Sequence, residues 1–232
     1  MEDIQSPFRR QLLVAGLLPD LQRWFEPLPP KKDSYSAWFQ AARTDDVALC
    51  RDLLARGFDP NTIEPALLDT ALLIAVRQGS LKVFKLLLST PGVNLDMRSR
   101  NGDNALMLAA FKKDVASTQA LIDKGAEVNR PEWTALHYAA ASGSLTIVRL
   151  LLDHDAYIDA ESPNKTTPLM MAARGGHRDV VELLLSQGAD LHFKNELGLT
   201  AVDFARAQGH LPLADALAVR MRDSKAPQLE QN

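Results

Sequence analysis

The stretch Thr167–Asp190, TPLMMAARGGHRDVVELLLSQGAD, decides how this chain folds. Thr167 and Pro168 are typical of a helix start, because a threonine hydroxyl accepts a bond from a free backbone N–H and proline tolerates the first helical position. The Gly175–Gly176 pair ends this short helix by supplying a positive φ. A second run of valine and leucine then follows helical spacing as far as Gly188. We therefore expect a helix–turn–helix unit, which exposes too much apolar surface to be stable alone.

The same helix start recurs along the chain. Good N-cap residues are spaced by 34, 34, 30, 33 and 33 residues, and each is followed by alanine or proline. The six positions are Ser36, Thr70, Asn104, Thr134, Thr167 and Thr200. Such regular spacing predicts six copies of one unit, stacked so that neighbours cover each other's apolar faces.

A period near 33 residues with a start of the form T-P-L-H-x-A resembles the ankyrin repeat. The units TALHYAAASGSLTIVRLLLDHDAYID, from Thr134, and the one at Thr167 carry the resemblance most fully, and it extends from residue 33 to about residue 220. The phrases ARGFDPN and RPEWTALHYAA are also similar to a bacterial subgroup of the family. The resemblance implies an all-α solenoid of stacked antiparallel helix pairs, joined by short β-hairpin-like finger loops.

We expect three regions: an N-terminal segment, 1–32, an ankyrin-repeat domain, 33–222, and a polar C-terminal tail, 223–232. The expected repeats are 33–65, 66–99, 100–130, 131–162, 163–195 and 196–222.

The N-terminal segment has two interpretations. Paired arginines followed by an apolar run, within residues 7–18, are typical of an export signal, although the run is short and no small-residue cleavage site follows. Alternatively, Arg9 to Phe25 forms an amphipathic helix that caps the open end of the first repeat, as repeat arrays require. We favour the cap, with a cytoplasmic location; a working signal would make the protein periplasmic or exported.

Composition excludes several classes of protein. Hydrophobic residues make up 46% and charged residues 24% of the chain, as in ordinary soluble folded proteins. The net charge of −3 favours neither nucleic acid nor a membrane surface, and no segment is long enough to span a membrane. Cys50 is the only cysteine, so an internal disulfide and a cysteine-built metal site are excluded, and we expect a small buried apolar side chain there.

No pattern in the sequence indicates catalysis. Glycine-rich phosphate loops, H-E-x-x-H and G-x-S-x-G are all missing from the sequence. His137 occupies the histidine position of the repeat motif, where bonds to neighbouring turns are expected. Asp153-His154-Asp155 is three adjacent residues that cannot converge on one metal ion, and Asp45-Asp46 is expected to cap a helix. We predict no catalytic residue, no cofactor and no metal site.

Several units depart from the repeat pattern. Asp45 and Lys113 stand where the first turn glycine is usual, and an extra residue near Thr90-Pro91 predicts a bulge in the second unit. Between Asn129 and Thr134 the interval is five residues, against about eight elsewhere, so this finger loop is expected to be shortened. Trp133, in this loop, either folds inward as a filler or stays exposed as an anchor for a partner.

The resemblance implies a partner-facing concave surface made by the first helix of each repeat and the finger loops. The implied positions carry seven basic residues and four acidic ones, an excess of three that contrasts with the negative chain. The basic residues are Arg43, Arg77, Arg98, Arg100, Lys112, Arg174 and Lys194, and the acidic ones are Asp69, Asp103, Glu161 and Glu196. This excess predicts a partner protein with an acidic or polar segment, unless these are ordinary solvated charges. The candidate partner-binding residues are Arg77, Arg98, Arg100, Asp103, Phe111, Lys112, Trp133, Arg174, Leu197 and Leu199.

Our leading hypothesis is a monomeric, non-catalytic scaffold for protein–protein interaction. An enzyme or metal-dependent protein is the first alternative. Nucleic-acid binding is the second, and it is disfavoured because the sequence lacks a continuous basic stripe and stacking aromatics.

Overall fold

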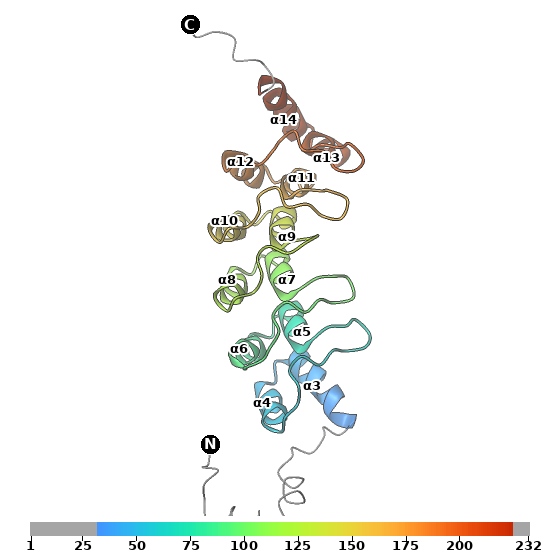
Figure 1. Ribbon diagram of the computed structural model, residues 1–232, viewed down its shortest axis with the longest axis vertical. Helices are drawn as coiled ribbons and strands as arrows, with labels where there is room; N and C mark the ends of the chain where they lie inside the picture. Colours follow the sequence, from blue (N-terminus) through green and yellow to red (C-terminus); the bar gives the residue numbers. More distant parts are fainter. Residues whose placement is uncertain (1–31, 225–232) are drawn as a thin grey trace, which may run out of the picture.

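The computed structural model describes residues 32–224, which form twelve α-helices and no named strand. The helices follow one another as six pairs stacked into an elongated solenoid (Figure 1). We call the first helix of each pair the inner helix and the second the outer helix. The pairs are α3 (Lys32–Thr44) and α4 (Val47–Ala55), α5 (Ala71–Gln78) and α6 (Leu81–Ser89), α7 (Ala105–Phe111) and α8 (Val115–Asp123), α9 (Ala135–Ser142) and α10 (Leu145–Asp153), α11 (Pro168–Arg174) and α12 (Arg178–Ser186), and α13 (Ala201–Ala207) and α14 (Leu211–Asp223).

The inner helices pack directly on one another along the solenoid, and the outer helices α4 to α12 form a second column beside them (Figure 1). Alanine pairs occupy the contacts between inner helices, where small side chains let two backbones approach closely. Six of these alanines are 0% exposed: Ala109, Ala110, Ala139, Ala140, Ala172 and Ala173. Larger side chains, such as Leu121 on α8 and Leu151 on α10, fill the space between inner and outer helices. One continuous apolar cluster therefore runs through all six pairs.

Five of the six predicted N-caps stand immediately before an inner helix. The hydroxyl of Thr70 accepts a bond from the backbone N–H of Leu73, and Asn104 and Thr167 make the same contact three residues ahead. The prediction for Ser36 is wrong, because α3 begins at Lys32 and Ser36 lies inside it. No proline or glycine stands between Lys32 and Ser36 to stop the helix, and the preference for a serine cap amounts to only about 1 kcal/mol.

The turns between inner and outer helices need a left-handed residue. Gly79, Gly143, Gly176 and Gly209 supply it with φ between 68° and 78°, and Asp45 and Lys113 take φ of 57° and 60° at the equivalent positions. Gly175, expected to share this role, is instead right-handed, with φ of −77°. The Asp45 carboxylate accepts bonds of 2.9 Å from the N–H groups of Lys82 and Val83, and Asp46 caps α4, as predicted for this pair.

The extra residue of the second unit lies directly after α6. Thr90 leaves the helix in an extended conformation, and the left-handed glycine, Gly92, follows two residues later. After α4, α8 and α12 the left-handed glycine follows the C-cap at once. The predicted bulge is therefore present.

The predicted terminal regions are described only in part, because the structure covers residues 32–224. Helix α14 continues to Asp223, one residue into the expected tail. The proposed cap or export signal within residues 1–31 lies outside the described residues. Between residues 32 and 224, no helix combines the length and the apolar character needed to cross a membrane.

The stacking contacts generate a prediction about stability. Ala139→Leu and Ala172→Leu should each lower the free energy of unfolding by on the order of 1–3 kcal/mol, because the added methylenes must fit between two helices that already touch. Denaturant unfolding followed by circular dichroism measures the change. Ala216→Leu, at an exposed position of α14, is the matched control and should be nearly neutral. A loss of less than a few tenths of a kcal/mol at Ala139 would mean that the inner helices do not meet through this face.

Candidate functional site

The finger loops join each outer helix to the next inner helix, and one of them is short. The loops are residues 56–70, 90–104, 124–134, 154–167 and 187–200, so the third has eleven residues where the others have fourteen or fifteen. In Figure 1 this loop, between α8 and α9, is visibly smaller than the loops on either side. The shortening predicted from the spacing of Asn129 and Thr134 is confirmed.

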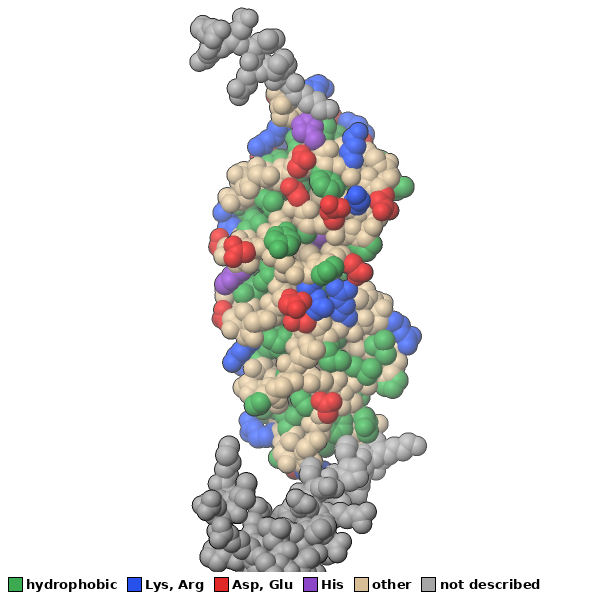
Figure 2. All heavy atoms as spheres, viewed as in Figure 1, with side chains coloured by type: hydrophobic (Ala, Val, Ile, Leu, Met, Phe, Trp, Pro, Cys, Tyr) green, Lys and Arg blue, Asp and Glu red, His purple; other side chains and the backbone are tan. Residues whose placement is uncertain are grey.

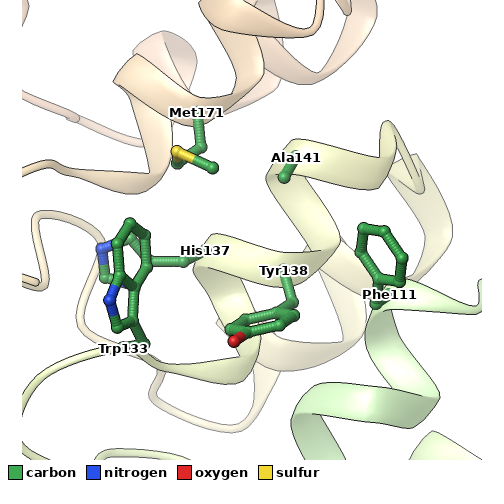
Figure 3. A pocket seen from close by; sticks show the side chains of 6 residues that line it. All are labelled: Phe111, Trp133, His137, Tyr138, Ala141 and Met171. Carbon is green, nitrogen blue, oxygen red and sulfur yellow. The ribbon is translucent and has the colours of Figure 1, made fainter. Parts of the chain in front are cut away.

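An open pocket lies beside the short loop, on the inner helices. Its volume is about 210 Å³, and its lining is almost entirely carbon. In Figure 3, Trp133 and Phe111 stand at opposite ends of the pocket with Tyr138 between them. The lining residues are Phe111, Trp133, His137, Tyr138, Ala141 and Met171, drawn from α7, the short loop, α9 and α11.

The repeat register explains why the surface is hollow at this point. Phe111, Ala141 and Arg174 each lie seven residues after the N-cap of their inner helix, so they occupy the same position in three consecutive pairs. Arg77 occupies it in the second pair. Alanine therefore stands between two large side chains, and the hollow is the volume that a larger residue would fill.

Trp133 forms one wall of the pocket without filling it. Its side chain is half-buried and packs edge-on against the ring of His137, with ring centroids 5.1 Å apart. At the other end, Phe111 is 56% exposed and meets Tyr138 edge-on at 6.2 Å. Both aromatic residues that the sequence singled out thus lie at the same pocket.

Hydrogen bonds fix the tautomer of His137, and burial holds its ring neutral. The Nε2 atom lies 2.9 Å from the Thr166 carbonyl, which can only accept, so Nε2 carries the proton. The Nδ1 atom then accepts from the Thr134 backbone N–H at 3.2 Å, closing a capping box. Burial lowers the pKa of His137 to about 4 from an ordinary 6.5. The bonds to neighbouring turns predicted from the repeat motif are confirmed, and both ring nitrogens are engaged within the fold.

A chain of buried polar groups supports the floor of the pocket. The Tyr138 hydroxyl donates to the carboxylate of Asp103, and burial together with this bond raises the pKa of Tyr138 well above its ordinary value. Arg77 lies 3.5 Å from Asp103 and donates to Asp69 at 3.0 Å. Burial raises the pKa of Asp69, against the opposing effect of Arg77. Arg77 and Asp103, both predicted as partner-binding residues, are thus bonded to each other and to the fold.

Most of the predicted basic residues are likewise engaged within the chain. Arg98 donates to the Glu132 carboxylate at 2.7 Å and to the Pro131 carbonyl at 3.2 Å. Lys112 donates to the Val76 and Arg77 carbonyls at the end of α5. On the face shown in Figure 2, basic side chains lie beside acidic ones instead of forming a continuous stripe.

The charge excess expected from the sequence is therefore too large. Arg43 pairs with Glu64 and Arg98 with Glu132, and neither glutamate was included in the count. With both included, seven basic residues face six acidic ones, and the excess falls from three to one. Sequence position could not show this, because each pair joins residues more than twenty positions apart.

Besides Lys112, two predicted basic residues have no acidic partner in the described part of the chain. Arg100 is exposed and donates to the Pro65 carbonyl at 3.2 Å. Arg174 is exposed at the end of α11, one turn beyond Met171. Leu197 and Leu199 are 77% and 39% exposed on the last finger loop and do not line the pocket. The predicted site residues are thus spread along the solenoid, and only Phe111 and Trp133 line the pocket.

Three pocket residues were missed by the prediction of partner-facing positions: His137, Tyr138 and Met171. Tyr138 and Met171 both lie four residues after an N-cap, so the repeat register could have placed them on the same face as Phe111. Ala141 occupies a partner-facing helix position implied by the resemblance, but it was not among the ten candidates, because its contribution is the absence of a large side chain.

A second hollow, of about 640 Å³, lies between α3 and the first finger loop. Its walls include Tyr35, Phe39 and Ile63, and the ion pair between Arg43 and Glu64 lies at its edge. Elsewhere, Cys50 is buried, as expected, and burial raises the pKa of its thiol to about 12. Among residues 32–224, no group of three or more His, Cys, Asp or Glu side chains is placed to hold a metal ion.

The comparison with protein families identifies the architecture. The family model "Ankyrin repeats (3 copies)" matches residues 38–132, 72–162, 128–195 and 156–225, which together cover most of the chain. The chain belongs to the ankyrin-repeat family. Ankyrin repeats generally mediate protein–protein interaction, so the fold itself favours a protein partner.

Three relatives illustrate the range of proteins that carry similar repeats. This chain is 32% identical over 150 residues to ankyrin repeat and KH domain-containing protein mask-1 of Caenorhabditis elegans, covering 62% of this chain and 6% of that protein. It is 32% identical over 155 residues to human SH3 and multiple ankyrin repeat domains protein 2, covering 65% of this chain and 8% of that protein. It is 35% identical over 128 residues to the probable E3 ubiquitin-protein ligase XBOS31 of Oryza sativa subsp. japonica, covering 53% of this chain and 29% of that protein.

The chain spans less than a third of the length of each of these relatives. All three come from eukaryotes, so they do not support the expected likeness to a bacterial subgroup.

The state of His137 generates a prediction about pH. The folded protein holds this histidine neutral, whereas the unfolded chain gains a proton below about pH 6.5, so stability is lost as the pH falls from 6.5 toward 4. The full effect is on the order of 3 kcal/mol. Urea unfolding midpoints at several pH values between 7 and 4.5 measure it.

The matched comparison is His137→Gln, which should be less stable at pH 7 but should lose less stability on acidification. His154→Gln, at an exposed position, should behave like the parent chain. Comparing variants isolates His137, because Asp69, Asp96 and Asp159, whose pKa values burial raises, change stability in the opposite direction. Parallel pH profiles for the parent and His137→Gln would contradict the assignment.

Proposed function

We propose that this chain is a non-catalytic protein–protein interaction module that binds its partner on the concave face formed by the inner helices and finger loops. The proposal divides residues 33–222 into six repeats, with boundaries at 33–65, 66–99, 100–130, 131–162, 163–195 and 196–222. The observation that carries it is the open apolar pocket lined by Phe111, Trp133, Tyr138 and Met171 on this face. Apolar and aromatic side chains that line an open pocket are the usual anchors of protein recognition.

The chemistry of the site argues against catalysis. A general base needs a free ring nitrogen and a pKa near the working pH, whereas both nitrogens of His137 are bonded within the fold and its pKa is about 4. One relative is named a probable E3 ubiquitin-protein ligase, but it matches this chain over 29% of its own length. The shared part of the two chains is the repeats, so we assign no ligase activity to this protein.

The arrangement of charge argues against nucleic acid. Binding along a phosphate backbone needs several free cations in a row, and Arg43, Arg77 and Arg98 are paired with carboxylates. Lys112 donates to the carbonyls of α5. Arg100 and Arg174 are exposed and have no acidic partner among residues 32–224, which suits a partner with a few acidic residues.

The proposal predicts how binding should change in two variants. Once a partner has been isolated by affinity capture, Arg100→Glu should slow its association several-fold at low salt and less at high salt, because an exposed charge steers the encounter. Stopped-flow or surface-based kinetics at two salt concentrations measure this effect. Arg149→Glu, an equal charge change on the outer helix α10, is the control and should leave the association rate nearly unchanged.

Trp133→Ala separates an anchor from a filler. Weaker binding with an unchanged unfolding midpoint identifies Trp133 as a contact, whereas lower stability with intact binding identifies it as support for the loop. If Arg100→Glu and Trp133→Ala both leave the affinity unchanged, the partner binds the outer helices or an end of the solenoid, and the concave-face assignment is wrong.

A further inference from the structure

We propose that the pocket takes one large apolar side chain, of the size of leucine, methionine or phenylalanine, from an extended partner segment that places an acidic residue against Arg174. This inference rests on the proposed function and specifies the chemistry of the partner. It follows from the lining of the pocket, from its size and from the charges around it.

The lining is almost entirely carbon, and the hydroxyl and imidazole groups that border the pocket are already bonded within the fold. The Tyr138 hydroxyl is already bonded to Asp103, and both ring nitrogens of His137 are bonded to the backbone. A polar ligand atom placed in the pocket would lose its water and meet mostly carbon there, which costs free energy. An apolar side chain gains from leaving water and meets the faces and edges of Trp133, Tyr138 and Phe111.

The size of the pocket limits the occupant to one side chain. A volume of about 210 Å³ is below the roughly 300–1,000 Å³ of pockets that hold drug-sized ligands. It is also too small to accept the face of a partner helix, which presents several side chains at once. A single residue projecting from an extended segment fits this shape, and burying it should improve affinity roughly tenfold to a hundredfold.

The surrounding charges select an apolar occupant over a cation. Aromatic rings around a hollow can also bind an ammonium group. Here, however, the nearest carboxylates are compensated, because Asp103 lies against Arg77 and Glu132 is paired with Arg98. A cationic ligand would therefore meet no net negative charge.

Arg174 supplies the second element of recognition. It lies three residues after Met171 on α11, so the two side chains share a face of the helix, one lining the pocket and the other beyond its rim. It is exposed and has no acidic partner among residues 32–224. An acidic side chain close in sequence to the apolar anchor would complete this pair, and the charge complementarity fixes the direction of the segment.

A peptide selection on the full chain tests the proposal. Random twelve-residue peptides displayed on phage are selected against the immobilised protein, and the best sequences are synthesised for titration by fluorescence anisotropy. We expect the selected peptides to share one large apolar residue with an aspartate or glutamate nearby. Replacing the apolar residue by alanine should weaken binding at least tenfold, and replacing it by lysine should do the same.

Ala141→Phe is the decisive protein variant, because it fills the pocket at a position where the preceding repeat already carries Phe111. It should weaken binding of the selected peptides at least tenfold. The matched control is Ala207→Phe, the equivalent position of the last inner helix, which is exposed and should leave binding unchanged. If Ala141→Phe lowers the unfolding midpoint, Ala141→Met fills the pocket with a more flexible side chain and replaces it.

The charged contact has its own pair of variants. Arg174→Glu should weaken the binding of the acidic peptides, and the loss should be smaller at high salt. Arg149→Glu, on the outer helix α10, should leave their binding unchanged. Peptides that require a lysine or another cation at the anchor position would overturn the proposal. Peptides that bind equally well to Ala141→Phe and the parent would overturn it too, yet they would leave the proposed interaction function intact on another surface. A native partner that is insensitive to Arg100→Glu and Trp133→Ala would instead remove the concave-face function itself.

Discussion

The close contact between consecutive inner helices is the constraint on which the rest of the structure depends. One helix pair cannot enclose its own apolar surface, so each pair is stable only when its neighbours cover it. The fully buried alanines, among them Ala110, Ala140 and Ala173, set how closely the helices approach. Side chains of ordinary size at these positions would push the pairs apart and expose the leucines between inner and outer helices.

This close approach also allows each repeat to cap the one before it. The last carbonyls of an inner helix have no partner within that helix. Here a side chain of the following pair donates to them: Lys112 to Val76 at 3.0 Å, His177 to Ala141 at 3.0 Å and His210 to Arg174 at 3.2 Å. Ser142 donates to Ala110 at 3.3 Å in the same way. Different residue types serve one purpose, because the geometry of the stack brings the next turn within reach of these carbonyls.

The sequence was informative wherever a residue acts through its own backbone or its immediate neighbours. Thr70, Asn104 and Thr167 cap helices as their residue types predict, and the interval before Thr134 predicted the short loop. Ser36 failed because a cap is a weak preference that a continuing helix overrides. The ion pairs could not be predicted, since the partner of each arginine comes from a distant part of the chain: Arg98 meets Glu132, 34 residues away. The pocket was not predicted either, because it arises from the absence of a large side chain at Ala141, between Phe111 and Arg174 in the repeat register.

The pocket shows how a regular scaffold can acquire a specific site. Residues that obey the repeat are committed to stacking and capping, so they are poorly available to a partner. Two departures meet at α9: the short loop brings Trp133 to the inner helices, and alanine replaces a large side chain at position 141. Neither disturbs the stack, because contacts in a solenoid extend only to the nearest neighbours and a change in one unit stays local. Irregularities of this kind can therefore accumulate at small cost in stability, and we expect specificity in such a chain to lie where the repeat pattern is broken.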